Sequence, residues 1–421
     1  MTEEAQQKIR SLVEMAMGYV VKPQPLLVPA IPETLDALVE QLNNNLSLNG
    51  STTTASQNPQ EQQDEETWDG ESFGVRLAGL GKLLSNDVTK ATLACKPPAE
   101  TKTVVGMIDA LAETCFRLAG FVESIPVKVA GQAYKCEIQV LANNIFLATA
   151  GLLNEFLVNK VEEVQIQEQT LSLKGDVHGL SKKAVESSSS VLKGETAKTE
   201  DGYLVKTGIV WEACQIFEQA SRSNRQAVAK KLGDMMSTME DAIAEVQDMI
   251  DSNDDKGGNE DEDGDGSGSE SDDSWNDDEK MTEEEKQLSV RANALLKLTR
   301  MLLKKLQQRC LDTQSNVLTA AAPSSTSSST ISLKSSDLAM MCDQLYDRAG
   351  GIVALADEIA TSLYSPQDQS AIVEMLQELN RKNHDCILVG RLFVRGQTEH
   401  EKWLDMCETQ AKKILDTVFQ K

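Results

Sequence analysis

The sequence predicts an all-α protein made of two antiparallel helical bundles, similar to those of vinculin and talin, with disordered acidic and Ser/Thr-rich linkers. Aromatic residues are only 4% of the 421 residues, whereas Leu, Ala, Glu, Gln and Lys, which favour helices, are abundant. Apolar residues recur at helical spacing over long segments, and prolines punctuate the boundaries between them. No segment shows convincing strand alternation.

The first half of the chain reads as a series of helices broken by proline and by polar linkers. Pro32 suits a first helical turn, and "CKPPAE" and "ESIPVK" are breaks, because the residue before a proline disfavours helix. Polar linkers interrupt the series at 49–66 and 174–202. The expected helices span 3–20, 32–48, 70–94, 99–123, 127–160, 204–220 and 223–251.

The second half begins with a low-complexity acidic segment, 252–280, whose polarity leaves too little apolar surface to order it. A Ser/Thr-rich linker, "AAPSSTSSSTIS", follows the first helix of this half, and Ser365 with Asp368 predicts a later helix cap. The expected helices span 281–311, 335–364, 366–390 and 397–420. We therefore divide the chain into an N-terminal region (1–251), an acidic linker (252–280) and a C-terminal region (281–421) that completes or forms the second bundle.

The formal charge of −25 is concentrated in one segment. Between Asp251 and Glu285 there are seventeen acids and two lysines, so the rest of the chain is only mildly acidic. Phosphate contacts need a basic surface, so this charge argues against binding to nucleic acid or to an anionic membrane.

Two segments bear on targeting. The N-terminus "MTEEAQQKIR" has no apolar stretch of the secretory type. Residues 140–158 are apolar enough to suggest a membrane span, but they contain Asn143, Asn144, Asn154 and Glu155, and Glu155 in particular is costly in lipid. We interpret them as a buried bundle helix.

The eight cysteines lie within helical patterns and form no CxxC pair, which is typical of reduced thiols in the cytosol or nucleus. Cys214, in "GIVWEACQIF", is a candidate nucleophile, metal ligand or core residue. A nucleophile needs a base, and His178, His384 and His400 lie in no catalytic signature. Cys214 lies at the edge of an apolar helix face, so the core interpretation is favoured.

Metal sites are not expected either. The pairs His384 with Cys386 and His400 with Cys407 lack a second pair at structural-zinc spacing. Asp261, Asp263 and Asp265 imitate the first half of a calcium loop, but the required hydrophobic anchor and flanking helices are missing. P-loop, GxGxxG and GxSxG motifs are absent from the sequence. We expect no catalytic activity, no metal and no cofactor.

Two features suggest regulation by charge. Ser267, Ser269 and Ser274 each precede an acid by three residues, as acidophilic kinases prefer, although the segment is equally explained as a solvated spacer. The segment 286–310 has seven basic residues and no acid. Opposite the apolar face of this helix lie four of the basic residues: Lys286, Lys297, Arg300 and Lys304. They form either a solvated helix face or a docking face for an acidic partner or for the acidic linker.

Trp211 projects from the polar side of its helix, toward Gln215 and Glu218. It either packs against another helix or marks a binding surface, because Trp is enriched at the centres of interfaces.

Several landmarks occur together in one order: "VWEACQ" (210–215), the long helix from "SRSNRQAVAKKLGDMM", an acidic tract that ends in Trp275-Asn276-Asp277-Asp278, "VRA" (290–292), "RMLLKKL" (300–306) and "SDLA" (336–339). This order resembles the cyclin-D-binding protein family, also called GCIP-like or cyclin-D-interacting helix-loop-helix proteins. "ESFGVRLAGLGKLLSNDVTKAT" (71–92) looks like the early helix of that family. The likeness extends over most of residues 70–421.

The resemblance implies an all-helical, non-enzymatic protein that binds D-type cyclins and helix-loop-helix transcription factors. It implies that the protein dampens cell-cycle progression and transcription, and occurs in the cytoplasm and nucleus. Trp211 and the basic face formed by Lys286, Lys297, Arg300 and Lys304 are the candidate partner contacts. A vinculin-like cytoskeletal adaptor and a nucleic-acid-associated protein are the alternatives, which actin co-sedimentation and the salt dependence of nucleic-acid binding would distinguish.

Overall fold

The structure is a computed structural model that describes residues 1–20, 68–161, 202–255, 281–311, 317–318, 331–332, 335–394 and 397–419. Within these ranges the regular structure is helical except for one pair of two-residue strands, so the all-α prediction is confirmed. The helix expected at 32–48 and the linker expected at 49–66 lie outside the described residues, and so do residues 174–201 and 256–280 of the other two expected linkers. Residues 252–255, which were expected to belong to the acidic linker, are instead the end of the helix Asn224–Asp255.

The chain divides into two compact units, with the described residues up to Ala227 in unit 1 and those from Val228 in unit 2. From the sequence, this division was expected after residue 251. The helix Asn224–Asp255 crosses the boundary, because its first turn binds unit 1 while its later turns bind helices of unit 2. Hydrophobic periodicity indicates which face of a helix is buried, but not which of two cores buries it. The sequence pattern therefore could not locate this division.

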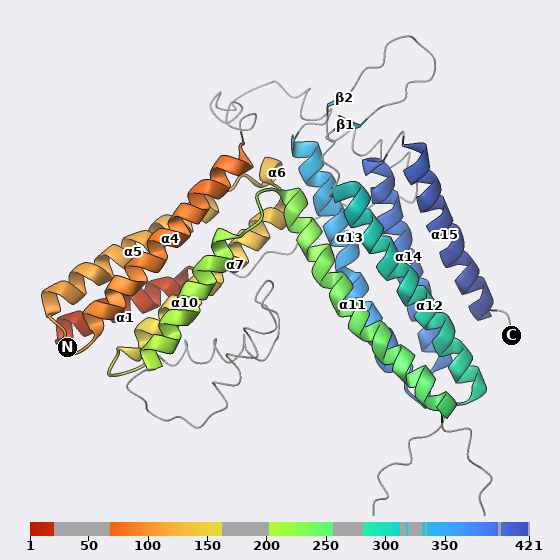
Figure 1. The fold of residues 1–421 in the computed structure, drawn as a ribbon, viewed down its shortest axis with the longest axis horizontal. Helices are drawn as coiled ribbons and strands as arrows, with labels where there is room; N and C mark the ends of the chain where they lie inside the picture. Colours follow the sequence, from red (N-terminus) through yellow and green to blue (C-terminus); the bar gives the residue numbers. More distant parts are fainter. Residues whose placement is uncertain are drawn as a thin grey trace, which may run out of the picture. The chain divides into compact units, whose positions relative to one another are not determined.

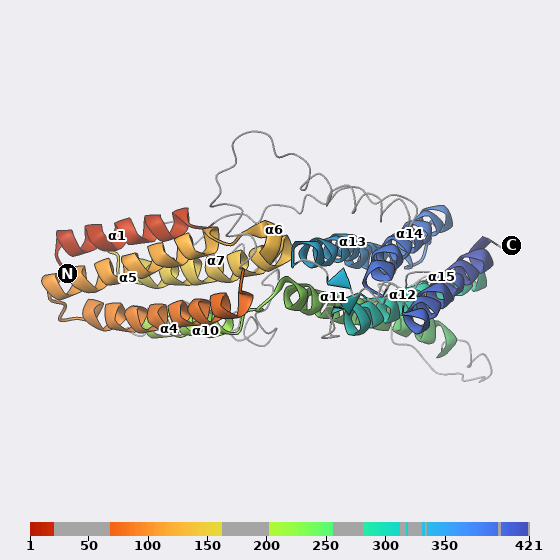
Figure 2. The same cartoon turned by 90° about the horizontal axis from the view of Figure 1, so that it is seen from above.

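The described residues of unit 1 form the helices α1 (Glu3–Gly18), α4 (Gly70–Cys95), α5 (Thr101–Glu123), the short α6 (Val127–Ala130), α7 (Gln132–Glu155) and α10 (Gly202–Glu218). Neighbouring contacts run in the order α1, α5, α4, α10, α7 and back to α1, so the five long helices enclose one core (Figures 1 and 2). Its largest fully buried side chains include Tyr134, Phe217, Leu77 and Ile108. Each such aliphatic side chain contributes about 1.5–3 kcal/mol relative to exposure.

Local sequence explains where these helices begin and end. The carboxylate of Asp69 caps α4 by accepting from Glu71 N at 3.0 Å, and the hydroxyl of Thr2 caps α1. The helix expected over 127–160 is instead broken at Gly131, which has φ of +89°. At that position a Cβ atom would lie 2.0 Å from the Asn224 side chain, whose Oδ1 accepts from Tyr134 N.

The helix α7 is long and apolar enough to span a membrane by length and composition alone. However, 67% of its apolar window is buried inside unit 1, where it contacts α1, α5 and α10. Its apolar character is therefore accounted for by the core, as the sequence analysis expected for 140–158.

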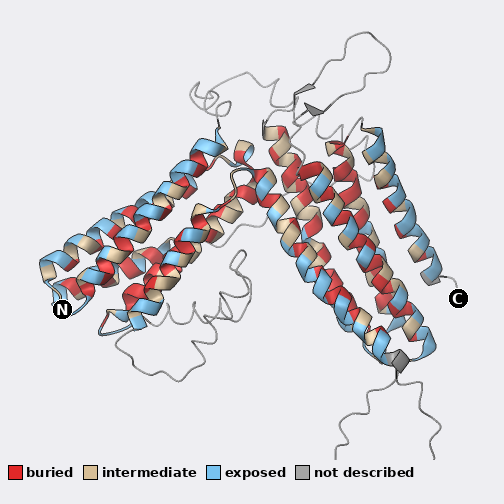
Figure 3. Ribbon diagram, viewed as in Figure 1, coloured by how far each residue is buried: buried red, intermediate tan, exposed pale blue. Residues whose placement is uncertain are grey.

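Unit 2 contains α11 (Asn224–Asp255), α12 (Glu283–Leu306), α13 (Ser335–Ser362), α14 (Gln369–Phe393) and α15 (Thr398–Phe419). Residues Gln307–Leu311 continue α12 as a π-helical turn. Helix α12 contacts α13, α14 and α15, and it is hydrogen-bonded to α11, so it is the central element of the unit (Figure 1). The buried residues of α12 form one side of the helix, and its other side is exposed (Figure 3).

Glu285 joins two distant parts of unit 2. It forms a capping box with Thr282: Glu285 N donates to Thr282 Oγ1 at 3.2 Å, and its carboxylate accepts from Thr282 N at 2.8 Å. The same carboxylate accepts from Gln367 N, in the turn before α14, at 3.0 Å. The backbone donors of Gln367 and Thr282 hold the pKa of Glu285 below its usual range.

Two expectations for unit 2 need correction. The helix after Ser365 begins at Gln369, and its N-cap is Asp368, which accepts from Ser370 N and Ala371 N at 3.1 Å; Ser365 Oγ instead faces Glu285 at 3.5 Å. Val317–Leu318 (β1), just before the Ser/Thr-rich linker, pairs antiparallel with Ile331–Ser332 (β2) at its end. Val317, Leu318 and Ile331 are strand-favouring or apolar residues, but the runs were too short to show alternation.

Candidate interaction surfaces

The contact between α4 and α10 in unit 1 positions Trp211. The two helices run antiparallel: Thr92 and Thr207 share a hydrogen bond at 3.3 Å, Trp211 Nε1 donates to Thr89 Oγ1 at 3.1 Å, and Lys82 approaches Glu218 at 4.0 Å. These polar contacts fix which side chains of the two helices meet.

Cys214 faces inward from this contact and is buried, which confirms the core interpretation. Burial raises the pKa of its thiol to about 12. A thiol with that pKa is protonated at neutral pH, and the thiolate is the reactive form, so Cys214 is held as an apolar core group.

Trp211 itself is both packed and exposed. Although its indole N–H is hydrogen-bonded, 47% of the residue is accessible to solvent. Leu93 of α4 is 68% exposed and Leu204 of α10 is 54% exposed, and the antiparallel register brings both to the same end of the contact. We call Trp211, Leu93 and Leu204 the Trp211 patch. Beside it, a Cβ atom on Gly208 would meet nothing within 4 Å, so the surface there is open.

The four basic residues proposed on the helix 286–310 do not form one free face. Lys297 Nζ donates to Gln247 Oε1 of α11 at 2.9 Å, and Arg300 pairs with Glu240 of α11 at 2.6 Å. Lys304 is exposed, whereas Lys286 is partly buried near the start of α12. Two of the four candidates are thus engaged by a neighbouring helix, and Lys304 is directed to solvent.

The far end of α12 adds an aromatic contact. Arg309, in the π-helical turn, makes a cation–π contact with Trp403 of α15: its guanidinium carbon Cζ lies 5.0 Å from the centre of the Trp403 ring. These two residues line a shallow depression together with Lys305, Leu306, Cys310, Val394, His400 and Leu404.

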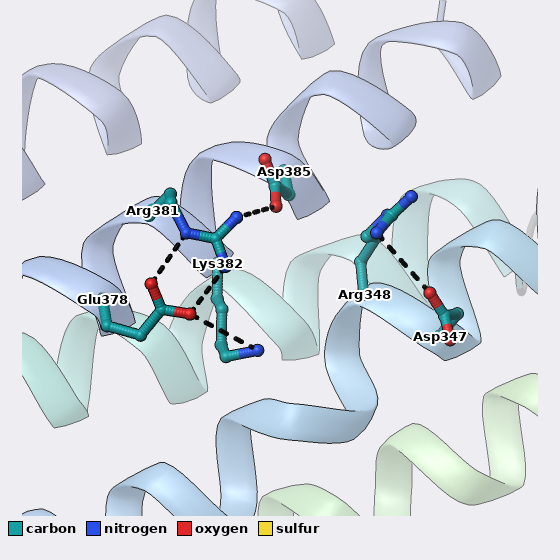
Figure 4. Close-up of polar contacts among 6 residues, drawn as sticks. All are labelled: Asp347, Arg348, Glu378, Arg381, Lys382 and Asp385. Carbon is teal, nitrogen blue, oxygen red and sulfur yellow. Dashed lines mark hydrogen bonds and ion pairs between the residues drawn. The ribbon is translucent and has the colours of Figure 1, made fainter. Parts of the chain in front are cut away.

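Six charged residues of α13 and α14 form local ion pairs (Figure 4). Arg381 pairs with Glu378 at 2.6 Å and with Asp385 at 3.1 Å, and Lys382 approaches Glu378 at 3.8 Å. Arg348 approaches Asp347 at 3.6 Å. Such exposed or half-exposed pairs stabilise little, and within this group of six residues the charges neutralise one another.

The histidine and cysteine pairs of α14 and α15 also have structural roles. His384 Nδ1 lies 2.9 Å from Glu408 of α15, and Arg391 binds both Asp405 and Glu408 at 2.7 Å. Cys386 is fully buried, and burial raises its pKa to about 12. Among the described residues, no group of three or more His, Cys, Asp or Glu side chains is arranged to hold a metal ion.

Several candidates lie outside the described residues: Ser267, Ser269 and Ser274, the calcium-like loop, and His178. They stay predictions from sequence.

Two family models match the chain. The model described as Grap2 and cyclin-D-interacting, N-terminal, matches residues 163–252, and its C-terminal counterpart matches residues 258–387. Together they cover just over half of the chain. No curated protein matches the sequence. Trp211 lies in the first matched range and the four basic candidates of α12 lie in the second, whereas residues 71–92 precede both.

Proposed function

The chain belongs to the Grap2 and cyclin-D-interacting (GCIP) family, and from this membership we propose that it is a non-catalytic regulator that binds other proteins through its helical surfaces. Its partners are D-type cyclins, as the family description suggests, and helix-loop-helix transcription factors. By binding them it restrains cell-cycle progression and transcription, in the cytoplasm and the nucleus.

The observation that carries this proposal is the Trp211 patch. A half-exposed Trp with two exposed Leu residues toward one end of the same helix pair has the composition of an interface centre, because Trp supplies a large contact area and loses little conformational freedom on binding. Trp211 and Leu204 lie within a matched family range, whereas Leu93 is supplied by a helix that precedes it.

The first test measures binding of the purified full chain to a purified D-type cyclin by titration calorimetry. Trp211→Ala is expected to weaken binding about thirtyfold or more, because truncating a Trp at the centre of an interface costs about 2 kcal/mol or more. Thr89→Val removes the hydrogen bond that anchors the indole but keeps the indole itself, so it should weaken binding much less than Trp211→Ala does. Phe116→Ala, which truncates another exposed aromatic residue on α5, is the matched surface control.

Circular dichroism first establishes that all variants retain the helical content of the wild type. If Trp211→Ala binds the cyclin as tightly as the wild type, the patch is not the contact. If the wild type binds no D-type cyclin and co-sediments with actin filaments instead, the cytoskeletal adaptor becomes the better description.

A further inference from the structure

The exposed side of α12 carries a regular stripe of side chains. Val290, Ala294, Lys297, Met301 and Lys304 follow one another at spacings of four, three, four and three residues, so they lie along one line on the helix surface. We call these five residues the α12 stripe. It extends over 14 residue steps, or about 21 Å. Helix α12 lies between α11 and α15 in unit 2 (Figure 1), and the stripe lies opposite the buried residues of α12 on the helix surface.

The apolar members of the stripe are not accounted for by the core of unit 2. Val290 is 48% exposed and Met301 is 43% exposed, while the buried residues of α12 occupy the opposite side of the helix. A single exposed apolar residue is ordinary, but two at helical spacing with a small Ala between them form an anchor line. The flexible thioether of Met301 can adapt to the side chains of a partner.

From Lys286 onward the charges of α12 itself are all basic, whereas its first turn carries Glu283, Glu284 and Glu285 and the neighbouring α11 supplies Glu240. From Lys286 to Leu311 the chain carries seven basic residues and no acid. Glu240 neutralises Arg300, but Lys304 has no ion-pair or hydrogen-bond partner among the described residues. In a chain of net charge −25, this is a basic strip that attracts acidic groups.

We propose that the α12 stripe binds an acidic amphipathic helix of a partner protein. Apolar side chains of that helix would cover Val290, Ala294 and Met301, and its carboxylates would pair with Lys297, Lys304 and the adjacent Lys305. Lys297 can do so by exchanging its neutral acceptor, Gln247, for a carboxylate. The stripe lies in unit 2 and the Trp211 patch in unit 1, so this inference does not depend on the proposed function.

The acidic segment of this same chain fits only half of that description. Residues 256–280 supply the negative charge, but Trp275 is their only large apolar residue. One anchor cannot cover Val290 and Met301 together, so a partner helix is the better occupant.

The test uses the full chain and a labelled synthetic peptide of about 18 residues, long enough to span the stripe as a helix. Leu occupies one face of the peptide and Glu the other, and binding is followed by fluorescence anisotropy. Met301→Ser and Lys304→Glu should each weaken binding roughly five- to tenfold. Lys304→Glu should also reduce the salt dependence of binding, because it removes an attraction that salt screens.

Matched controls come from α5 of unit 1. Phe116→Ser and Lys102→Glu make comparable changes to an exposed apolar and an exposed basic residue, and they should leave binding unchanged. The proposal is overturned if the wild type binds a scrambled peptide of the same composition equally well, or if the two α12 variants bind like the wild type. It is also overturned if a peptide of residues 256–280 competes as strongly as the amphipathic peptide, since charge alone would then suffice.

Discussion

Trp211 illustrates how one residue can satisfy two interpretations that the sequence left open. Its hydrogen bond to Thr89 anchors the indole between two helices, yet almost half of the residue is accessible to solvent. An anchored aromatic side chain loses little freedom when a partner covers it, so its packing favours binding. Trp211 therefore packs against α4 and also remains accessible to a partner.

The buried thiols predict how stability depends on alkaline pH. Burial raises the pKa of Cys115, Cys214 and Cys386 to about 12, above the ordinary value of 9.0. Since the unfolded thiols lose their protons more easily, the free energy of unfolding should fall as pH rises from about 9 to 12. Urea unfolding at several pH values should show this decline, and it should be shallower for Cys214→Ala than for the wild type. Parallel pH profiles for the two proteins would contradict the prediction.

The environment of a residue could be predicted from the sequence only where the periodicity of its own helix determines it. The wheel of a single helix placed Cys214 in the core, and that was confirmed. The partners of Lys297 and Arg300 lie 50 and 60 positions away along the chain, on α11. Their engagement depends on the register between two helices, which periodicity does not specify. The Trp211 patch also needed a second helix, because Leu93 comes from α4.

Among the helices, the break at Gly131 gives the most specific expectation. Gly131→Ala forces a Cβ atom into the Asn224 side chain and a residue with a side chain into a left-handed conformation, so unit 1 should lose about 1–3 kcal/mol of stability. Gly120→Ala is the matched control: it lies inside α5 and its Cβ meets nothing within 4 Å, so helix propensity should stabilise it or leave it unchanged. Thermal unfolding followed by circular dichroism compares the two, and equal melting temperatures would refute the argument.

Helix existence was predictable from sequence, but some boundaries were not. Proline and polar punctuation placed α4, α5 and α10 close to their observed limits. The start of α14 was misplaced because Ser365 and Asp368 are both capping residue types. Glu285, 80 positions before Ser365, faces its hydroxyl and binds the next turn through Gln367 N, which leaves Asp368 to cap the helix. Only a tertiary contact distinguishes the two candidates.

The division into two units predicts that the whole molecule unfolds in two steps. Gly131→Ala alters unit 1, whereas Glu285→Gln weakens the charge-assisted hydrogen bonds that join Thr282 and Gln367 in unit 2. Differential scanning calorimetry should show two transitions, each variant lowering a different one by a few degrees. A single transition that both variants lower equally would mean that the units unfold as one.

The division at Ala227 also limits how this protein can be shortened for expression. A recombinant fragment that started at residue 163, where the family match begins, would contain α10 but lack α4 and α7. Val210, Cys214 and Phe217 would then lose the helices that cover them, and their apolar surface would promote aggregation. Gene boundaries chosen from the family match alone would therefore cut through a folding unit, and a soluble product requires the helices that precede it.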